Sequence, residues 1–379
     1  MKDEFHPLLI AAVRRETADA VSLAVTVPDG LRQSFAYRPG QHLVIRAKLG
    51  GQEVRRTYSI SSGPEDKELW ITVKRVDGGL FSNHVHADLA PGATLESMAP
   101  AGRFVAPIDK GGENTGGDGH TYLAIAAGSG ITPVMALIRH VLARETNSRF
   151  ALIYGNRSLD SIIFREALDD LKDRYLGRLS IMHVLSRDAD ADVPLLSGRI
   201  DGDRITRLLP AIARPDDIDH AYLCGPGSLI KDARDTLLAL GVPRERIHFE
   251  YFRAGPQSEQ QSAPLLTPPR PASETGFAKT SAGKSDVGAE VVATIDGKRY
   301  TFRVPPDGLV VDAALAAGIR VPYSCKGGMC CTCRAKLVEG KVIMLRNFSL
   351  EPWEIEADFV LTCQAQPTTS RIVIDYDQV

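Results

Sequence analysis

The first 112 residues alternate apolar and polar positions over short stretches, which is typical of β-strands with one buried face. Segments 43–46 and 69–74 show this alternation most clearly. Pro-Gly pairs at 39–40 and 91–92 are turn signals that separate such stretches. Short strands at this spacing predict an antiparallel β-barrel domain over residues 1–112.

Residues 113–252 have a different pattern, in which continuous apolar runs alternate with longer stretches of helical periodicity. The helical stretches are 132–145, 163–171 and 228–240. The runs that we interpret as buried strands are Tyr122–Ala126, Phe150–Tyr154, Leu179–Leu185 and His220–Leu223. Strands that alternate with helices predict an α/β domain with a parallel sheet and crossover helices.

The composition changes again at residue 253. Residues 253–288 are rich in Pro, Ser, Thr and Gly, and Phe277 is their one aromatic residue. Such a segment buries too little apolar surface to offset its ordering entropy, so 253–288 is predicted to be a flexible linker. The Gly-rich stretch 111–119 is interpreted as a hinge. Residues 289–379 then form a small module of strands and short helices.

The cysteines point to the first chemistry. Cys325, Cys330, Cys333 and Cys363 follow the pattern C-x4-C-x2-C-x29-C. The first three positions match the plant-type [2Fe–2S] spacing. A zinc ion also takes four thiolates, but zinc sites normally use two C-x2–4-C knuckles, whereas this grouping is three plus one. We therefore interpret these four residues as cluster ligands, and Cys331 as a small packing residue.

Residues 289–379 resemble the plant-type ferredoxin family. The match lies in segment 325–335 and in Leu361-Thr362-Cys363-Gln364, which contains the fourth cysteine. The resemblance implies a β-grasp sheet crossed by a helix, for which 310–317 is the candidate.

Two segments of the predicted barrel suit a flavin. Arg56-Thr57-Tyr58-Ser59 would place an aromatic wall against an isoalloxazine ring, with polar groups for phosphate. Residues 79–83, Gly-Leu-Phe-Ser-Asn, precede an expected helix over 84–89, whose N-terminus could bind a pyrophosphate. The alternative for each segment is an ordinary structural role.

Two further segments lie at the ends of predicted parallel strands. Residues 128–133, Gly-Ser-Gly-Ile-Thr-Pro, have the strand–turn–helix context of a dinucleotide site but lack the full glycine fingerprint. Residues 224–227, Cys-Gly-Pro-Gly, end another strand before another helix. Ligands of open α/β sheets bind at such carboxyl ends.

Taken together, these motifs resemble the ferredoxin–NADP reductase superfamily over residues 1–252. The resemblance implies FAD, with FMN as the alternative, and a nicotinamide nucleotide. It places Cys224 beside the nicotinamide and packs the segment 250–252 on the flavin. The implied catalytic residues are Tyr58, Ser59, Cys224 and Glu250. The implied cofactor-binding residues are Arg56, Thr57, Tyr58, Ser59, Val73, Lys74, Gly79, Leu80, Phe81, Ser82, Gly128, Ser129, Gly130, Thr132, Pro133, Arg157, Ser186, Arg187, Cys224, Gly225, Pro226, Glu250 and Phe252.

Ser186 and Arg187 resemble the pair that binds the 2′-phosphate of NADPH, and Arg157 or Arg165 could add charge. We therefore expect NADPH to be preferred over NADH. The alternative is that these arginines are solvated surface charges.

The chain combines a predicted flavin site, a predicted nicotinamide site and a ferredoxin module at its end. This arrangement resembles that of oxygenase reductases, and in particular the reductase subunits of phenylacetyl-CoA epoxidases. The resemblance implies electron transfer from NADPH through FAD and [2Fe–2S] to a di-iron oxygenase in phenylacetate catabolism. The chain shows no carboxylate–His di-iron motif, so the oxygenase must be another polypeptide. The alternatives are a reductase for another multicomponent oxygenase and a redox-sensing adaptor.

Composition and hydropathy exclude several other classes of protein. The 45 basic and 47 acidic residues give a net charge of −2, which excludes a strongly basic nucleic-acid binder. The apolar stretch 122–138 is interrupted by Gly and Pro, so no membrane span is expected. No secretory signal is visible, and we expect a cytoplasmic protein.

Overall fold

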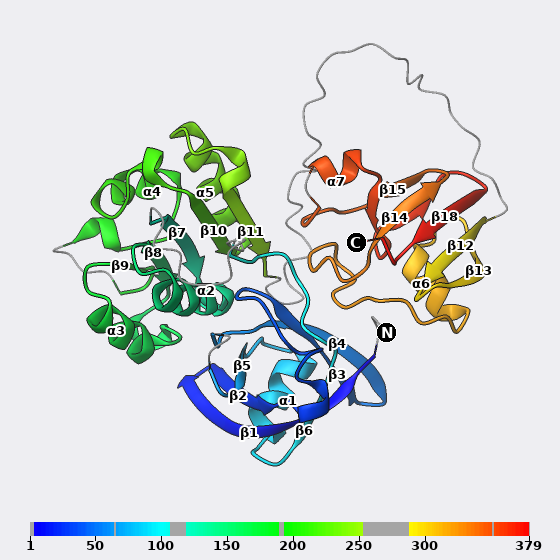
Figure 1. The fold of residues 1–379 in the computed structure, drawn as a ribbon, viewed down its shortest axis with the longest axis horizontal. Helices are drawn as coiled ribbons and strands as arrows, with labels where there is room; N and C mark the ends of the chain where they lie inside the picture. Colours follow the sequence, from blue (N-terminus) through cyan, green and yellow to red (C-terminus); the bar gives the residue numbers. More distant parts are fainter. Residues whose placement is uncertain are drawn as a thin grey trace, which may run out of the picture. The chain divides into compact units, whose positions relative to one another are not determined.

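The computed structural model describes residues 4–63, 66–106, 119–188, 193–252, 288–350 and 352–378 (Figure 1). The chain divides into two compact units, Phe5–Gln261 and Ser262–Val379, the second of which also takes Met1–Glu4. Apart from Gly288 and Gly119, the predicted linker 253–288 and the predicted hinge 111–119 lie outside the described residues.

The first unit begins with the predicted antiparallel sheet, which closes into a barrel. Its strands pair in the order β4-β3-β6-β1-β2-β5, and an antiparallel bridge between Ile60 and Ile71 joins the end of β4 to β5. Alternating side chains such as Leu8, Leu23 and Leu43 are fully buried in its core. The elements are β1 (His6–Thr17), β2 (Ala20–Thr26), β3 (His42–Leu49), β4 (Gln52–Ser59), β5 (Leu69–Lys74), α1 (Leu80–Asp88) and β6 (Thr94–Ser97).

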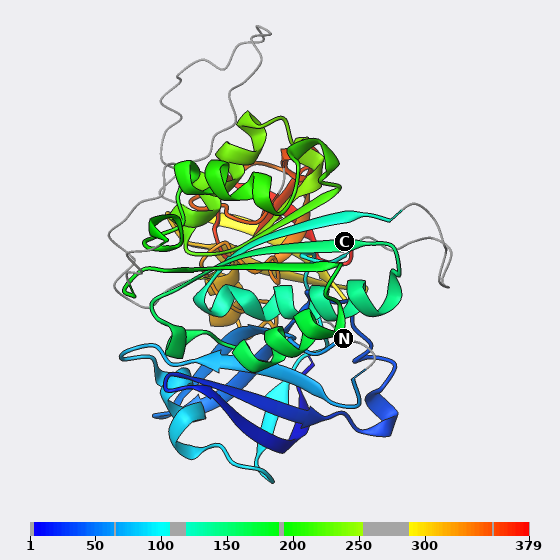
Figure 2. The ribbon, with the colours of Figure 1, turned by 90° about the vertical axis from the view of Figure 1, so that its left-hand side faces the viewer.

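The second half of this unit is the predicted parallel sheet, with strand order β11-β10-β7-β8-β9. Its strands are β7 (Thr121–Ala127), β8 (Arg149–Asn156), β9 (Leu179–Leu185), β10 (His220–Gly225) and β11 (Ile247–Tyr251). Its helices are α2 (Ile131–Arg144), α3 (Arg165–Arg174), α4 (Gly202–Leu208) and α5 (Gly227–Ala239). Helices cover both faces of the sheet, with α2 and α3 on one and α4 and α5 on the other (Figure 2).

The strand order reverses between β7 and β10, because the chain leaves β7 toward β8 and β9 and later returns to the other side. This is the topological switch point at which open α/β sheets bind ligands. The predicted motifs at 128–133 and 224–227 follow these two strands, so the fold brings them to one place.

Two helix starts differ from the sequence predictions by more than one residue. Helix α1 begins at Leu80 rather than at residue 84, so Phe81 and Ser82 lie in its first turn. Helix α3 begins at Arg165 rather than at 163, because Phe164 has a left-handed backbone (φ 63°) that cannot belong to a right-handed helix.

The barrel and the parallel sheet share a hydrophobic core within this unit. The Phe104 ring lies 5.2 Å from the Tyr222 ring in an edge-to-face arrangement. The Tyr222 hydroxyl donates to the Val105 carbonyl at 3.2 Å, and the Arg38 guanidinium donates to the Ala106 carbonyl at 2.6 Å. These contacts fix the sheet against the barrel at the seam between them.

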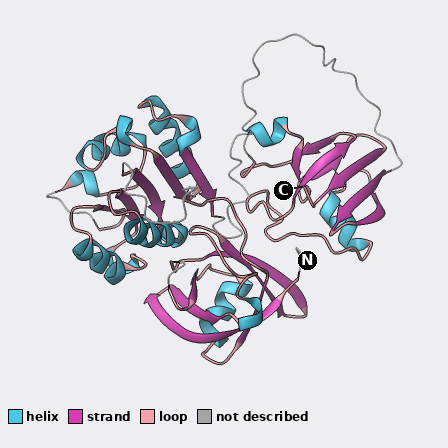
Figure 3. Ribbon diagram, in the orientation of Figure 1, coloured by secondary structure: helices cyan, strands magenta, loops and turns pink. Residues whose placement is uncertain are grey.

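The second unit is a mixed sheet with strand order β13-β12-β18-β14-β16, in which β12 and β18 are parallel (Figure 3). Val310 and Val311 of α6 are buried against it, which confirms the expected β-grasp arrangement. The strands are β12 (Ala289–Ile295), β13 (Lys298–Val304), β14 (Arg334–Glu339), β15 (Val342–Met344), β16 (Phe359–Leu361), β17 (Ala365–Pro367) and β18 (Arg371–Asp375). The helices are α6 (Val310–Ala316) and α7 (Pro352–Glu356).

Among the described residues, none of the helices combines the length and the apolar character needed to cross a bilayer.

Candidate functional site

A polar cluster lies where the end of the barrel meets the parallel sheet. Ser59, the last residue of β4, donates its hydroxyl to Oε2 of Glu250 on β11 at 3.3 Å. His42 lies opposite Ser59 in the β3–β4 register, and its Nδ1 is 3.5 Å from Oε1 of Glu250. The carboxylate of Glu250 therefore contacts two barrel residues that are far from it in the sequence.

His42 is the residue that sequence patterns missed. Its side chain is 2% exposed, and neither ring nitrogen has a hydrogen-bond partner among the described residues. A buried imidazole without hydrogen bonds is costly unless a further group satisfies it, which makes the position a candidate for contact with a ligand or for proton transfer. A single His at a strand start has no spacing signal, so the sequence offered no means of finding it.

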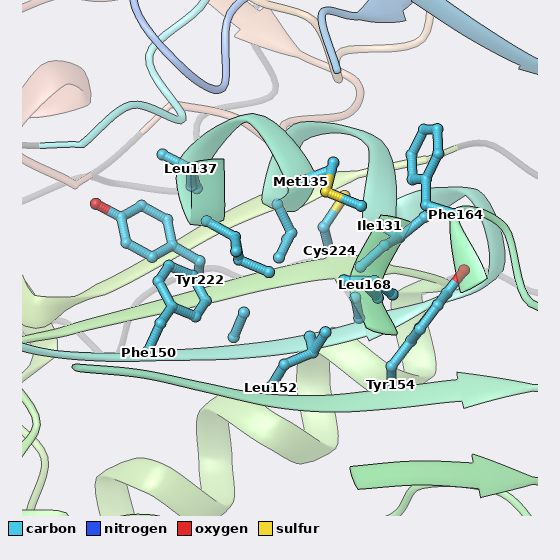
Figure 4. Packing of buried hydrophobic residues seen from close by; sticks show 14 of the residues in the cluster. Ile131, Met135, Leu137, Phe150, Leu152, Tyr154, Phe164, Leu168, Tyr222 and Cys224 are labelled. Carbon is cyan, nitrogen blue, oxygen red and sulfur yellow. The ribbon is translucent and has the colours of Figure 1, made fainter. Parts of the chain in front are cut away.

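Cys224 lies beside this cluster at the end of β10, in register with Glu250. The thiol is fully buried under α2, next to Met135 (Figure 4). Burial, and after it the Glu250 carboxylate, raises the pKa of Cys224 well above its usual value. This environment disfavours the thiolate, which is the nucleophilic form of cysteine.

The predicted dinucleotide loop packs directly on Cys224. A Cβ at Gly130 would lie 2.2 Å from the Cys224 carbonyl oxygen, so only glycine permits this approach. Gly128 has a left-handed backbone (φ 54°), and its carbonyl accepts a hydrogen bond from the Tyr154 hydroxyl at 3.0 Å. The structure thus joins the motifs at 128–133 and 224–227 into one surface at the switch point.

Two residues of that loop have side chains that face inward. Thr132 is 1% exposed and donates its hydroxyl to the Ser129 carbonyl at 3.0 Å. Pro133 is buried in the first turn of α2, where a missing N–H costs nothing. Both residues therefore shape the loop from within, and their side chains do not face solvent.

On the barrel side, the Tyr58 ring lies 5.5 Å from the buried Phe81 ring at an interplanar angle of 31°. Burial raises the pKa of the Tyr58 hydroxyl, and the nearby Arg56 opposes this effect. Arg56 itself is exposed, while Thr57 beside it is half-buried. An aromatic face flanked by an exposed guanidinium is the arrangement that the flavin hypothesis requires.

At the start of α1, the backbone of Gly79 lies very close to the Ser82 side chain. A Cβ at Gly79, the N-cap, would lie 2.6 Å from the Ser82 hydroxyl. That hydroxyl accepts a hydrogen bond from the Val76 backbone at 3.1 Å, so it holds the turn. Leu80 is 57% exposed at the same end and offers an apolar surface to a ligand.

Val73 and Lys74 end β5 at the seam. Val73 is buried, whereas the Lys74 ammonium lies 3.5 Å from Asp19 and 3.8 Å from where a Cβ of residue 128 would be. A barrel cation therefore faces the dinucleotide loop. Phe252, just after β11, reaches the same region by donating its backbone N–H to the Gly225 carbonyl at 3.4 Å.

The predicted 2′-phosphate residues come together at the carboxyl ends of β8 and β9. The Ser186 backbone donates to the Asn156 carbonyl at 2.9 Å, and the Arg187 backbone donates to the Arg157 carbonyl at 2.8 Å. Ser186, Arg187 and Arg157 are all exposed. Two guanidinium groups and a hydroxyl on one rim form a surface that suits a phosphate monoester.

In the second unit, the four predicted ligands form two thiol pairs. Cys325 is hydrogen-bonded to Cys330, and Cys333 is hydrogen-bonded to Cys363. Within the described ranges, no three His, Cys, Asp or Glu side chains gather around a single ion position. Two pairs match a cluster of two irons, each of which takes two thiolates, better than they match one zinc ion with four.

The loop around these thiols directs backbone N–H groups at sulfur. The Gly327 N–H lies 3.3 Å from the Cys325 sulfur. The hydrogen bond from Cys330, aided by N–H groups of Gly327, Met329 and Cys330, lowers the pKa of Cys325. The same interaction raises the pKa of Cys330 well above its usual value, so the two thiols of this pair differ in how readily they lose a proton. The Cys331 thiol instead donates to the Ser349 carbonyl at 3.5 Å, which fits a packing role.

Comparisons with known proteins agree with this architecture. Family models match an oxidoreductase FAD-binding domain over residues 10–105, an oxidoreductase NAD-binding domain over 124–235 and a 2Fe-2S iron-sulfur cluster binding domain over 293–368. One of the subunits of the 1,2-phenylacetyl-CoA epoxidase of Escherichia coli (strain K12) is 41% identical over 98% of this chain and 98% of its own.

The chain belongs to the family of FAD- and NAD-binding reductases that carry a 2Fe-2S domain.

Other relatives of this reductase have related names. The 3-ketosteroid-9-alpha-monooxygenase, ferredoxin reductase component, of Rhodococcus rhodochrous is 35% identical over 97% of this chain and 96% of its own. The solved structure of phthalate dioxygenase reductase, described as a modular structure for electron transfer from pyridine nucleotides to [2Fe-2S], shares the fold with a TM-score of 0.53. It is 23% identical, over 99% of this chain and 98% of that one.

The reductase is therefore an oxidoreductase that uses FAD, NAD(P)H and a [2Fe–2S] cluster. The choice between zinc and iron is settled in favour of iron.

Proposed function

We propose that this chain is the NADPH-dependent reductase component of a di-iron oxygenase that acts on phenylacetyl-CoA. The observation that carries the proposal is the meeting of Cys224, Glu250 and Ser59 at the seam, on a chain that also holds two thiol pairs. FAD held at the seam would supply two-electron chemistry toward a nicotinamide and one-electron chemistry toward a [2Fe–2S] cluster held by the two thiol pairs. The 41% identical relative, whose name is that of a phenylacetyl-CoA epoxidase component, supports this choice of partner.

At the seam, each side chain has a distinct role in the proposal. Tyr58 forms an aromatic wall for the flavin, and Cys224 gives the nicotinamide a neutral surface against which to lie. Glu250 contacts both Ser59 and His42, so these three polar side chains would line the place where the flavin and the nicotinamide meet. The backbone of 128–130 receives the nucleotide pyrophosphate.

The cluster ligands in this proposal are Cys325 and Cys330 for one iron and Cys333 and Cys363 for the other. The Cys330→Ser variant should lose cytochrome c reduction with NADPH but keep ferricyanide reduction at the flavin. The matched control is Cys331→Ser, since Cys331 lies in the same loop but bonds to Ser349. Equal cytochrome c reduction in Cys330→Ser and wild type would remove the cluster from the electron path.

The choice of nucleotide rests on Ser186, Arg187 and Arg157. Arg187→Ala should raise the KM for NADPH about tenfold or more and leave the KM for NADH nearly unchanged, because only NADPH carries the 2′-phosphate. Arg174→Ala is the control, since it removes the same charge at the last residue of α3, before β9, whereas Arg187 follows β9. A wild type with the lower KM for NADH would contradict the assignment.

A second candidate is a reductase for a different oxygenase, favoured by the 35% identical 3-ketosteroid monooxygenase component. Reconstitution separates the two. The proposed function predicts NADPH-driven epoxidation when the chain is mixed with phenylacetyl-CoA epoxidase oxygenase subunits and their substrate. Rapid NADPH oxidation that transfers no electrons to those subunits would favour the second candidate.

A further inference from the structure

Thr362 is a fully buried polar residue that directly precedes the cluster ligand Cys363. Its backbone N–H and its hydroxyl both donate to the carbonyl of Cys333, at 3.1 and 2.8 Å. One residue, covalently next to Cys363, therefore holds the backbone of Cys333, the other member of the same thiol pair. The side-chain bond is the shorter of the two, so the hydroxyl is a substantial part of this attachment.

The peptide group between Thr362 and Cys363 is hydrogen-bonded at both of its polar atoms. Its carbonyl oxygen accepts from the N–H of Val311 in α6 at 3.2 Å. Its N–H belongs to Cys363 and is hydrogen-bonded to the Cys333 sulfur. A peptide group is planar, so its carbonyl and its N–H turn together. The orientation of Thr362 therefore decides how this N–H meets the sulfur of Cys333.

Tyr376, which follows β18, supports Thr362 from the other side. The Tyr376 side chain is buried, and its hydroxyl donates to Oγ1 of Thr362 at 2.9 Å. The single hydroxyl proton of Thr362 is directed at the Cys333 carbonyl, so Oγ1 is an acceptor toward Tyr376. Hydrogen bonds in series polarise one another. The donor from Tyr376 therefore strengthens the bond from Thr362 to Cys333, and the three residues form a relay.

The position of Tyr376 is set by a part of the sheet that contains no cysteine. Its backbone N–H donates to the Thr294 carbonyl on β12 at 2.9 Å. The next residue, Asp377, accepts the N–H groups of Asp296 and Gly297 in the turn between β12 and β13, at 2.9 and 2.8 Å. Tyr376 is thus anchored independently of the thiols that its hydroxyl reaches through Thr362.

We propose that Thr362 and Tyr376 are positioning residues for the Cys333/Cys363 thiolates, which hold the Cys363 N–H on the Cys333 sulfur and thereby retain the cluster and raise its reduction potential. The reduced cluster carries more negative charge, so an N–H directed at a ligand sulfur stabilises it more than the oxidised form. Replacing residues that orient metal ligands commonly changes metal affinity by about 10–100-fold.

Matched substitutions at Thr362 isolate its hydroxyl. Thr362→Val has nearly the same shape without the hydroxyl, so iron should be lost about tenfold faster, at the lower end of the range for residues that orient ligands. The reduction potential should become more negative. Thr362→Ser keeps the hydroxyl and should remain close to wild type in both quantities.

Tyr376→Phe removes the far end of the relay and should change both quantities in the same direction but less, because Thr362 still donates to Cys333. Tyr376 acts through the Thr362 hydroxyl, so the two effects should not multiply. The double variant Thr362→Val/Tyr376→Phe should therefore lose iron no faster than Thr362→Val. Tyr300→Phe is the control, since it makes the same chemical change in the same unit on β13, opposite Ala293, and should match wild type.

The test uses the purified full-length chain and these variants, after iron and sulfide have been measured. The rate at which a ferrous-iron chelator removes iron from the reduced chain is measured without oxygen, and an EPR-monitored titration gives the potential. A module that is merely less stable would lose iron faster at an unchanged potential, so an unshifted potential in Thr362→Val would overturn the inference. Iron loss in Thr362→Ser as fast as in Thr362→Val, or multiplied effects in the double variant, would also overturn it. If Thr362→Val assembles no cluster, Thr362→Ser must assemble one, and failure of both would count against the role of the hydroxyl.

This inference rests on the ligand set of the proposed function. A wild-type chain that lacked iron and sulfide would overturn that ligand set. A normal wild-type cluster, together with variants that match it in iron loss and potential, would overturn only the role of Thr362 and Tyr376.

Discussion

The seam site and the thiol site are built by different means. At the seam, His42, Ser59, Cys224 and Glu250 come from four strands, and Ser59 and Glu250 meet across 191 positions of sequence. In the thiol loop, three of the four ligands lie within residues 325–333, and N–H groups of the same loop point at their sulfur.

This difference in construction predicts how each site responds to amino-acid substitutions. A site made by packing two domains loses function gradually, because each side chain contributes a separate contact. A site whose ligands all bind one cofactor is lost as a whole, because metal binding and local folding are coupled. We therefore expect graded effects of substitution at the seam and all-or-none effects in the loop.

The largest effect should come from Cys363→Ser, which removes the one ligand that lies outside the loop. NADPH-dependent cytochrome c reduction should fall about 10²-fold or more, because the cluster does not assemble. Cys331→Ser should keep normal iron and sulfide content. A Cys363→Ser chain with a full cluster and full activity would show that the two sites do not differ in this way.

The next effect is expected at Gly130. A methyl group there would meet the Cys224 carbonyl at 2.2 Å, so Gly130→Ala should displace the dinucleotide loop. A shift of about 1 Å near reacting groups can cost about 10²-fold in rate, and we expect a loss of this order in kcat/KM for NADPH. Gly177→Ala, where a Cβ would meet nothing within 4 Å, should be silent. Unchanged steady-state kinetics in Gly130→Ala would contradict the close packing of the two motifs.

Graded losses, from a size similar to that at Gly130 downward, are expected from the polar cluster. Glu250→Gln should slow flavin reduction by NADPH by about 10²-fold, the lower range for a positioned acid or base. His42→Gln should slow it less, because Glu250 keeps its contact with Ser59. Stopped-flow flavin bleaching measures both rates. Complete loss of flavin reduction in both variants would contradict the graded response that we expect at the seam.

The smallest effect concerns stability. His248 stacks on Tyr222 at 5.0 Å, and burial, followed by the neighbouring His220, lowers the pKa of His248 to about 4. The unfolded chain binds this proton near the ordinary pKa of 6.5, so stability is full above that pH and falls as the pH drops toward 4. The loss should be on the order of 2–3 kcal/mol.

His248→Phe keeps the stacked ring without the proton, so part of this acid sensitivity should disappear. The measurement is thermal unfolding of the full chain at several pH values, followed by flavin release. Parallel pH curves for the variant and the wild type would contradict the role of His248.

Sequence patterns were sufficient for features with a regular period or fixed spacing. Alternation predicted the barrel, strand–helix order predicted the parallel sheet, and C-x4-C-x2-C predicted the cluster. Features that depend on tertiary packing were out of reach. His42 and the contact between Tyr376 and Thr362 have no spacing signal, and the inward direction of Thr132 becomes visible only once α2 is placed on the sheet. The late start of α3 follows from one left-handed residue, Phe164, that propensity does not reveal.

The most direct test of electron transfer from NADPH through flavin to cluster is to mix the chain with NADPH without oxygen and to follow the flavin absorbance and the EPR signal of the reduced cluster together in time. We predict that the flavin absorbance falls first and that a cluster signal, stoichiometric with the chain, then appears. A cluster that stays oxidised beside a fully reduced flavin, or that is reduced equally fast in a flavin-free preparation, would contradict this order of transfer.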